Sequence, residues 1–223
     1  GIVDDKENDA TTESAEITNS TSVMMTTVQG NDNAIGYVSL GSLSDSVKEV
    51  TVDGVEGTAE NVKTGKYKIS RPFNLCYYDG KLSKLAEDLI NFIMIDEGQK
   101  TVDKEGYISV ESGKSYKASG LKGKITVAGS TSVAPLMNVI ADEYKKLNPG
   151  VTIEIQESGS TAGIQSATEK AVDIGMSSRE LKDDEAKTLA TKKIAMDGIA
   201  VIVNKNNSID NLTSDQIKSI YLG

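Results

Sequence analysis

The stretch GKITVAGSTSVAPLMNVIADEYKKLNPGVTIEIQESGSTAG, residues 123–163, carries the clearest fold signal in the sequence. Apolar residues alternate with polar ones at 124–128 and again at 151–156, a pattern typical of β-strands. Between these runs, residues 133–147 have apolar side chains at helical spacing, with Pro135 in the first turn. Proline is tolerated there because the first N–H groups of a helix have no partner within it. The stretch therefore predicts a strand, a helix and a second strand.

The residues that follow continue this alternation. We expect helices at 162–170, 183–191 and 213–222, and strands at 172–176 and 199–204. Thr213 and Gln216 have the spacing of a capping box, which marks the start of the last helix. A regular alternation of strands and helices predicts an α/β fold with a mostly parallel sheet and right-handed connections.

The first half of the chain is less regular, and a polar segment separates it from the second half. The elements expected there are a helix at 20–30, strands at 34–40, 50–55 and 67–78, and helices at 85–95 and 97–103. Residues 1–17 are polar, so we expect a poorly ordered or surface segment there. The run ESGKSYKASGLK at 111–122 is rich in serine, glycine and lysine, and we interpret it as a linker.

Charge and composition exclude several classes of function. With 24 Lys and Arg against 33 Asp and Glu, the 223-residue chain has a net charge of −9, which is unfavourable for binding nucleic acid or an anionic membrane surface. The chain has no histidine and a single cysteine, Cys76. It therefore has no Ser-His or Cys-His catalytic pair, no His-ligated metal site and no internal disulfide. We expect no cofactor, and we expect Cys76 to be a buried, unreactive thiol.

Signals for membrane insertion or export are also absent from the sequence. No apolar run reaches the roughly 18 residues that a membrane-spanning helix needs. Residues 1–10 have neither the basic start nor the apolar run of a signal peptide. If the protein is exported, we expect this chain to be a mature or partial form.

Three short loops rich in serine, threonine and glycine follow three of the predicted strands: GSTS at 129–132, GSTAG at 159–163 and SSR at 177–179. Each loop precedes a predicted helix, at the edge of the sheet where ligands of α/β proteins usually bind. The N-terminus of a helix offers free N–H groups and a partial positive charge, and hydroxyl groups add further donors. The pattern indicates an oxyanion site, with ordinary helix capping as the alternative.

The candidate ligand residues from these loops are Ser130, Thr131, Ser132, Ser160, Thr161, Ser178 and Arg179. Arg179 is suited to hold an oxyanion through two N–H groups, but it is equally suited to pair with Glu180 or Asp183 at the next helix start. For Arg71, beside Pro72, we favour a structural salt bridge.

Long stretches of the sequence also match the sequence pattern of a known protein family. In the second half these are GKITVAGSTSVAPLMNVIADEYKKLNPG (123–150), VTIEIQESGSTAGIQSA (151–167), AVDIGMSSREL (171–181) and DGIAVIVNKNNSIDNLTSDQIKSIYLG (197–223). In the first half they are NAIGYVSLGSL (33–43), VDGVEGTAENVKTGKYKISRPFNL (52–75) and DEGQKTVDKEGYISV (96–110). With these stretches the chain resembles the phosphate-binding subunit of the high-affinity phosphate ABC importer.

The order of the halves differs from that family. The part that resembles the family's C-terminal half comes first, and the part that resembles its N-terminal half comes second. Nothing in this chain matches the segment between them, which in the family contains a strand and an Arg…Ser-Gly-Thr anion loop. Two explanations are open: a piece of a tandem array of phosphate-binding modules, or an engineered circular permutant with a deletion.

The resemblance implies a two-lobed fold of the periplasmic-binding-protein type (type II) with mixed, mostly parallel sheets. In this fold the lobes close on the ligand about a hinge. We expect residues 66–110 and 123–203 to build a complete first lobe. Residues 1–65 and 204–223 would then build a second lobe that lacks one strand, with 111–122 as the linker.

The resemblance also implies ligand positions. The family's first-lobe ligands fall on Thr131, Ser132, Ser160 and Ser178. Some members carry aspartate at the position of Ser178, and a carboxylate that only accepts favours protonated phosphate over sulfate. With serine there, such selectivity would need another acceptor, Glu157 or Glu180. Since the Arg…Ser-Gly-Thr loop has no match, we expect weak phosphate binding by this chain alone.

The function implied is an extracytoplasmic solute-binding protein, not an enzyme, that captures inorganic phosphate between its lobes for the permease subunits of an ABC importer. It would act on the outer side of the cell membrane, with a lipid anchor as one form of attachment of the full-length protein. The alternatives are a receptor for sulfate or another oxyanion, and an interaction module of a tandem array. A hydrolase is disfavoured because no general base of the usual kind is present. An open sheet edge in the incomplete lobe would favour a swapped or edge-paired oligomer.

Overall fold

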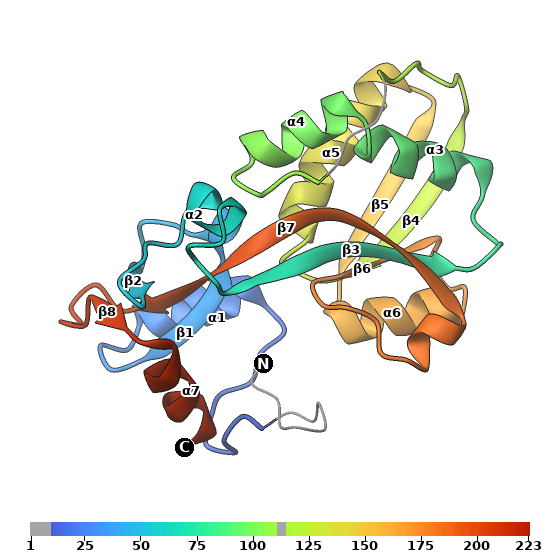
Figure 1. The fold of residues 1–223 in the computed structure, drawn as a ribbon. Coiled ribbons are helices and arrows are strands. Elements are labelled where there is room, and N and C mark those ends of the chain that lie inside the picture. Colours follow the sequence, from blue (N-terminus) through green and yellow to red (C-terminus); the bar gives the residue numbers. More distant parts are fainter. Residues whose placement is uncertain (1–9, 111–114) are drawn as a thin grey trace.

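Strands and helices alternate between residues 123 and 177, and they follow a less regular order in the rest of the described chain (Figure 1). The structure, a computed structural model, describes residues 10–110 and 115–223. Its helices are α1 (Thr21–Gln29), α2 (Ala59–Lys63), α3 (Lys84–Ile93), α4 (Asp96–Lys104), α5 (Ala134–Leu147), α6 (Ser160–Thr168) and α7 (Ser214–Leu222). Its strands are β1 (Ile35–Ser39), β2 (Lys48–Val52), β3 (Ser70–Tyr78), β4 (Gly123–Gly129), β5 (Val151–Glu157), β6 (Ile174–Ser177), β7 (Leu189–Val203) and β8 (Asn211–Leu212). Residues 1–9 of the expected surface segment and 111–114 of the expected linker lie outside the described residues.

Two groups of elements make up the molecule, and we call them the first and second lobes (Figure 1). The first lobe consists of α3, α4, α5, α6, β4, β5, β6 and the greater part of β3 and β7. The second lobe consists of α1, α2, α7, β1, β2, β8 and the end of β7 at 199–203.

The sheet of the first lobe has the strand order β5-β4-β6-β3-β7. Strands β5 and β6 both pair with β4 in parallel, so the loops after these three strands leave the sheet at the same edge. Helices α3, α4 and α5 cover one face through a large apolar core that includes Phe73, Leu89, Ile125 and Met137. Helix α6 covers the other face, where Ile164 packs with Cys76 and other apolar side chains.

Strands β3 and β7 connect the two lobes. They pair antiparallel over nearly their whole length, with a register shift between Phe73 and Asn74. Beyond this ladder, the last residues of β7 pair with β1 on one side and with β2 on the other. The two lobes therefore share a continuous strand, and Arg71 of β3 lies opposite Asp197 of β7 where the lobes join.

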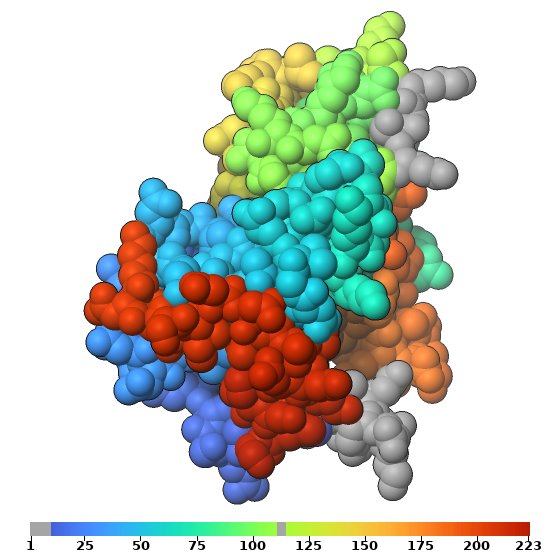
Figure 2. Space-filling view, turned by 60° about the vertical axis from the view of Figure 1, so that its left-hand side comes forward, coloured from blue at the N-terminus to red at the C-terminus, as the bar shows by residue number. Residues whose placement is uncertain are grey.

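In the second lobe, β7, β2 and β8 are neighbours, and β1 pairs with the other side of β7. Val28 of α1 packs against one face of this sheet, and Ile217 of α7 packs against the other. The Thr12 N–H donates to the Tyr221 carbonyl at 2.7 Å. Figure 2 accordingly shows the N-terminal segment (blue) beside α7 (red) on this lobe.

Most predicted elements form, with one clear exception. The predicted helix at 183–191 is wrong: only a 3₁₀ turn at 185–187 is present, and from Leu189 the chain is already in β7. The reason is tertiary, because the residues from 189 onward complete the hydrogen-bond ladder of the long β3 strand. The α/β class and the mixed character of the sheet are confirmed, but the sheet is not mostly parallel. Among the described residues, parallel pairing is limited to β5-β4-β6 and β2-β8. The pairs β1-β7, β2-β7, β3-β6 and β3-β7 are antiparallel.

Candidate anion-binding site

The loops after β4 and β5 are joined through the main chain of Gly129. Its carbonyl oxygen accepts hydrogen bonds from the N–H groups of Ser158 and Gly159, both at 2.9 Å. Gly129 has φ = 143°, and a Cβ atom there would lie 2.2 Å from the Met176 carbonyl oxygen. The close approach of β4 and β6 therefore requires glycine at this position.

Side-chain hydroxyl groups join the second loop to the third. The Ser178 N–H donates to Ser160 Oγ at 3.1 Å, and the hydroxyl oxygens of these two serines are 3.2 Å apart. In the first loop, the Ser132 N–H donates to Ser130 Oγ at 3.3 Å. The three loops thus form one connected polar surface at the edge of the sheet, as their positions after parallel strands predicted.

The second lobe reaches this surface through the start of α1. Thr131 Oγ1 donates to the Asn19 carbonyl at 2.7 Å, and Thr131 Oγ1 lies 3.3 Å from Thr21 Oγ1. Asn19 Nδ2 also donates to the Ser158 carbonyl at 3.3 Å. Ser20 is the N-cap of α1. These contacts hold the N-terminus of α1 against the loops of the first lobe.

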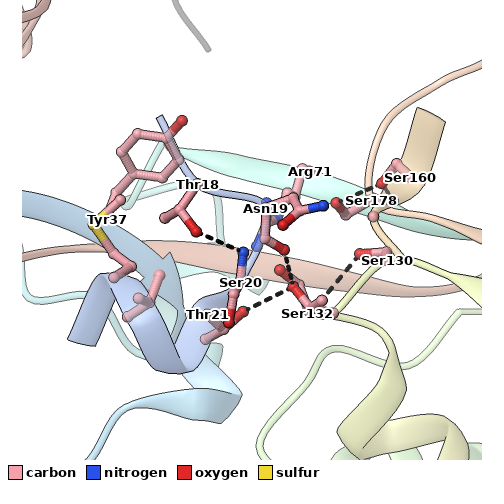
Figure 3. A pocket seen from close by; sticks show the side chains of 14 residues that line it. Thr18, Asn19, Ser20, Thr21, Tyr37, Arg71, Ser130, Ser132, Ser160 and Ser178 are labelled. Carbon is pink, nitrogen blue, oxygen red and sulfur yellow. Dashed lines mark hydrogen bonds between the residues drawn. The ribbon is translucent and has the colours of Figure 1, made fainter. Parts of the chain in front are cut away.

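A hollow of about 180 Å³ lies between these segments, and we call it the small hollow (Figure 3). It is lined by Thr18, Asn19, Ser20, Thr21, Met24, Tyr37, Val38, Arg71, Ser130, Thr131, Ser132, Gly159, Ser160 and Ser178. Three helices begin beside it, since Thr21 starts α1, Ser160 starts α6 and Ser132 comes shortly before α5. The lining is rich in hydroxyl groups, and among residues 10–110 and 115–223 it includes no carboxylate, which suits an anion and disfavours a cation.

Arg71 is the charged residue of this lining, and its side chain is 18% exposed. Arg71 Nε donates to Asp197 Oδ2 at 3.0 Å, and Ser39 Oγ donates to Asp197 Oδ1 at 2.6 Å. Asp197 is fully buried. Burial raises the pKa of its carboxyl group, while Arg71 and Ser39 act in the opposite direction. The salt bridge expected for Arg71 is present, and the residue also faces the hollow.

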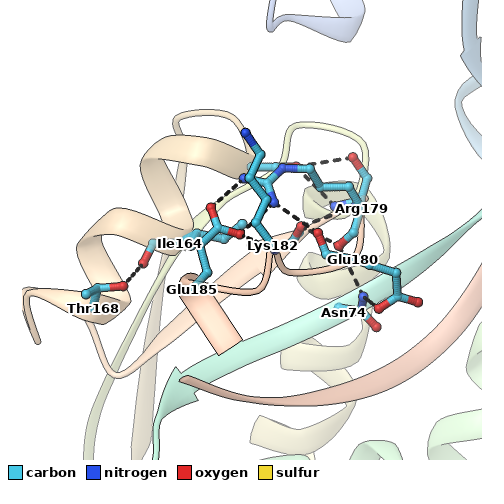
Figure 4. A network of polar contacts seen from close by, with 10 residues as sticks. Asn74, Ile164, Thr168, Arg179, Glu180, Lys182 and Glu185 are labelled. Atoms are coloured by element: carbon cyan, nitrogen blue, oxygen red, sulfur yellow. Dashed lines mark hydrogen bonds and ion pairs between the residues drawn. The ribbon is translucent and has the colours of Figure 1, made fainter. Parts of the chain in front are cut away.

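Two of the seven candidate ligands do not line the small hollow. Thr161 lies on the wall of a larger neighbouring hollow of about 890 Å³, which we call the large hollow. Arg179 lies there too, but its guanidinium makes a two-pronged pair with Glu185, with both N···O distances at 2.8 Å (Figure 4). Hydrogen bonds from Arg179 hold the pKa of Glu185 below its usual range. The structural alternative for Arg179 therefore holds, with Glu185 as the partner instead of Glu180 or Asp183. Arg179 is not positioned to bind an anion in the small hollow.

The two carboxylates considered as replacement acceptors lie outside the small hollow as well. Glu180 accepts from Asn74 Nδ2 at 3.2 Å and lies 3.8 Å from Lys193 Nζ. Glu157 is the last residue of β5. Neither provides the acceptor that would distinguish protonated phosphate from sulfate in this geometry.

The sequence and the fold match those of known proteins. A phosphate-binding protein, PstS 2, of Streptococcus agalactiae serotype V (strain ATCC BAA-611 / 2603 V/R) is 47% identical over 216 residues, covering 96% of this chain and 74% of the relative. The chain belongs to the PstS family of phosphate-binding proteins. The PstS 2 protein of Streptococcus pneumoniae serotype 4 (strain ATCC BAA-334 / TIGR4) is 45% identical over 220 residues, covering 98% of this chain and 75% of the relative.

A family-level match and a solved structure agree with this membership. Residues 114–223 match the PBP superfamily domain. The crystal structure of a phosphate-binding protein of a phosphate ABC transporter from S. pneumoniae TIGR4 superposes with a TM-score of 0.75 at 45% identity. That match covers 99% of this chain and 86% of the solved one. The periplasmic-binding-protein-like fold expected from the sequence is thereby confirmed.

The side of the small hollow that the second lobe forms was not predicted from the sequence. Thr18, Asn19 and Tyr37 lie far from the three loops in the sequence, and a Ser/Thr helix start at 20–21 predicts only a cap.

Within residues 10–110 and 115–223, no cluster of three or more acidic or cysteine side chains is arranged to hold a metal ion. Within the same residues, no helix is long and apolar enough to cross a membrane.

Proposed function

We propose that the chain binds inorganic phosphate in the small hollow and serves as the solute-binding component of an ABC importer. One observation supports the site most directly: Ser130, Thr131, Ser132, Ser160 and Ser178 line a hollow in which the described residues place no carboxylate. Serine and threonine hydroxyl groups, together with main-chain N–H groups at helix starts, are the donors that a tetrahedral oxyanion needs.

Family membership supports the ligand and the role. The relatives are named phosphate-binding proteins, and the solved relative belongs to a phosphate ABC transporter. A binding protein of this family acts without catalysing a reaction on its ligand. By extension we place the chain outside the cytoplasmic membrane, where it delivers phosphate to permease subunits.

The division into lobes supports a capture mechanism. We propose that residues 66–110 with 123–203, and residues 1–65 with 204–223, move as two bodies about the crossing strands β3 and β7. The contacts of Thr131 with Asn19 and Thr21 would then form and break as the lobes close and open.

The swapped or edge-paired oligomer stays a prediction, to be checked by light scattering.

Thermal denaturation with added anion tests the proposal. Phosphate that binds only the folded chain raises its melting temperature, by an amount that grows with the logarithm of concentration above Kd. Chloride at the same ionic strength is the control. An unchanged melting temperature in phosphate would contradict the proposed function and favour the interaction module.

A receptor for sulfate is the second candidate, because none of the described residues that line the small hollow is a carboxylate. The polar side chains of this described lining are neutral hydroxyls, an amide and one arginine, and these groups do not repel an anion that lacks a proton. The same melting experiment in sulfate separates the two candidates: a shift equal to that in phosphate indicates a general oxyanion receptor.

A further inference from the structure

Arg71 occupies the junction between the lobes. It lies on β3 opposite Asp197 of β7, on the pair of strands that connects the two lobes. The residue lines both the small and the large hollow. Figure 3 shows it between Asn19, which comes from the second lobe, and Ser178, which comes from the first.

The guanidinium of Arg71 is bound at its Nε–H group, and its other N–H donors make no hydrogen bond to a described residue. Its Nε–H group donates to Asp197 Oδ2, and the other oxygen of that carboxylate accepts from Ser39 Oγ. Within the part of the chain that the structure describes, neither Nη atom of Arg71 makes a hydrogen bond. A guanidinium carries five N–H donors, so the four on the two Nη atoms are available to a ligand.

The electrostatics of the small hollow give this cation a role. Phosphate carries one to two negative charges near neutral pH, and placing such charge in a partly enclosed site is costly without a cation. The net charge of −9 makes the field of the whole chain unfavourable for an anion. Among the described residues that line the small hollow, Arg71 alone is charged.

The other arginine of the chain provides a contrast. Both Nη atoms of Arg179 are bound to Glu185, and Nη1 also donates to the Glu180 carbonyl at 2.9 Å. Its donors are therefore used within the protein. In Arg71 the carboxylate binds only the Nε edge, an arrangement that orients the guanidinium and leaves the Nη groups for a partner.

We infer that Arg71 binds the anion through its Nη groups and that the buried Asp197 is the positioning residue that holds the guanidinium toward the hollow. This inference rests on the proposed function, and it adds a charged ligand to the hydroxyl groups of the three loops. A purely structural salt bridge between β3 and β7 would affect stability and leave anion affinity unchanged.

Calorimetric titration with inorganic phosphate at constant ionic strength tests the inference. The variants are Arg71→Gln, Arg71→Lys, Asp197→Asn and the double variant Arg71→Gln/Asp197→Asn. Lys48→Gln is the matched control, since Lys48 is a partly buried cation that pairs with the exposed Asp210, and neither residue lines either hollow. The melting temperature of each variant without phosphate measures its stability separately.

We expect Arg71→Gln to bind phosphate about 10- to 100-fold more weakly, the range for loss of a hydrogen bond to a charged group. The phosphate affinity of Arg71→Lys should lie between that of Arg71→Gln and that of the wild type, because an ammonium group keeps the positive charge but loses the paired N–H donors of the guanidinium. Asp197→Asn should weaken binding less than Arg71→Gln does. The double variant should bind no more weakly than Arg71→Gln alone, because Asp197 acts through Arg71. Lys48→Gln should bind like the wild type.

Several results would overturn the inference. If the wild type binds phosphate and Arg71→Gln and Arg71→Lys bind it equally well, Arg71 is structural and the proposed function stands. If the losses of Arg71→Gln and Asp197→Asn add up in the double variant, Asp197 does not act through Arg71. Absence of binding by the wild type would overturn the proposed function and this inference together.

A chemical measurement on the wild-type chain covers the case in which the Arg71 variants do not fold. Phenylglyoxal modifies accessible arginines, and mass spectrometry separates the two sites. Phosphate should protect Arg71 and leave the modification of Arg179 unchanged. Equal modification of Arg71 with and without saturating phosphate would contradict the inference.

Discussion

Gly129→Ala should destabilise the protein and weaken the site, because the added methyl group meets the main chain of β6. The new Cβ atom would lie 2.2 Å from the Met176 carbonyl oxygen, and ordinary contact begins near 3.4 Å, so the groups must separate by about 1.2 Å. Overpacking of this kind costs about 1–3 kcal/mol, and the positive φ adds about 1–3 kcal/mol. We expect a loss of about 4 kcal/mol in the free energy of unfolding and a fall in melting temperature of about 10 °C.

Circular dichroism during thermal unfolding measures this loss, and Gly65→Ala is the matched control. Gly65 also has a positive φ, 71°, but no heavy atom lies within 4 Å of its would-be Cβ atom. That variant should lose about 1–2 kcal/mol, from the backbone conformation alone. Gly129→Ala should also bind phosphate more weakly, because a shift of this size displaces the loop that carries Ser130. The reasoning is refuted if the two variants unfold at the same temperature and bind phosphate alike.

Three further predictions concern the candidate residues and the lone thiol. Arg179→Gln should lower stability by about 1–2 kcal/mol at neutral pH. The difference in melting temperature between this variant and the wild type should shrink as the pH falls through the lowered pKa of Glu185, because the Glu185 carboxylate stabilises the fold only when it is ionised. A constant difference down to pH 3 would contradict the pairing of Arg179 with Glu185. Burial raises the pKa of Cys76 to about 12, so a thiol reagent at pH 8 should react with Cys76 only after the protein unfolds. Rapid reaction of the native chain would contradict this prediction and show that the thiol is accessible. Ser178→Asp should weaken sulfate binding about 10-fold or more relative to phosphate binding, because an acceptor-only carboxylate repels an anion without a proton. Equal titration curves of this variant with sulfate and with phosphate would place Ser178 away from the ligand.

Local sequence patterns located the edge of the sheet where the site lies. The alternation at 124–128 and 151–156 placed the GSTS and GSTAG loops at the ends of parallel strands, and in the structure Ser132 and Ser160 line one hollow. These predictions succeed because a strand and its following helix are set by residues close in the sequence. The helix predicted at 183–191 is wrong because pairing with β3, more than 100 residues away in the sequence, competes with local helix propensity.

The roles of the two arginines could not be derived from the sequence. Arg71 meets Asp197 across 126 residues, and only the register of β3 against β7 brings them together. Arg179 precedes several carboxylates, and the turn at 185–187 determines that Glu185 is the one it binds. The N-terminus of α1 was recognisable as a helix start, but its place beside Thr131 depends on how the lobes pack.

The most direct test of the central claim is a calorimetric titration of the wild-type chain with phosphate, beside the double variant Ser160→Ala/Ser178→Ala. These two serines link the second and third loops at the wall of the small hollow. We predict saturable binding to one site per wild-type chain and a large loss of affinity in the double variant. Absence of saturable binding by the wild type, or equal binding by both proteins, would contradict the assignment of the small hollow as the phosphate site.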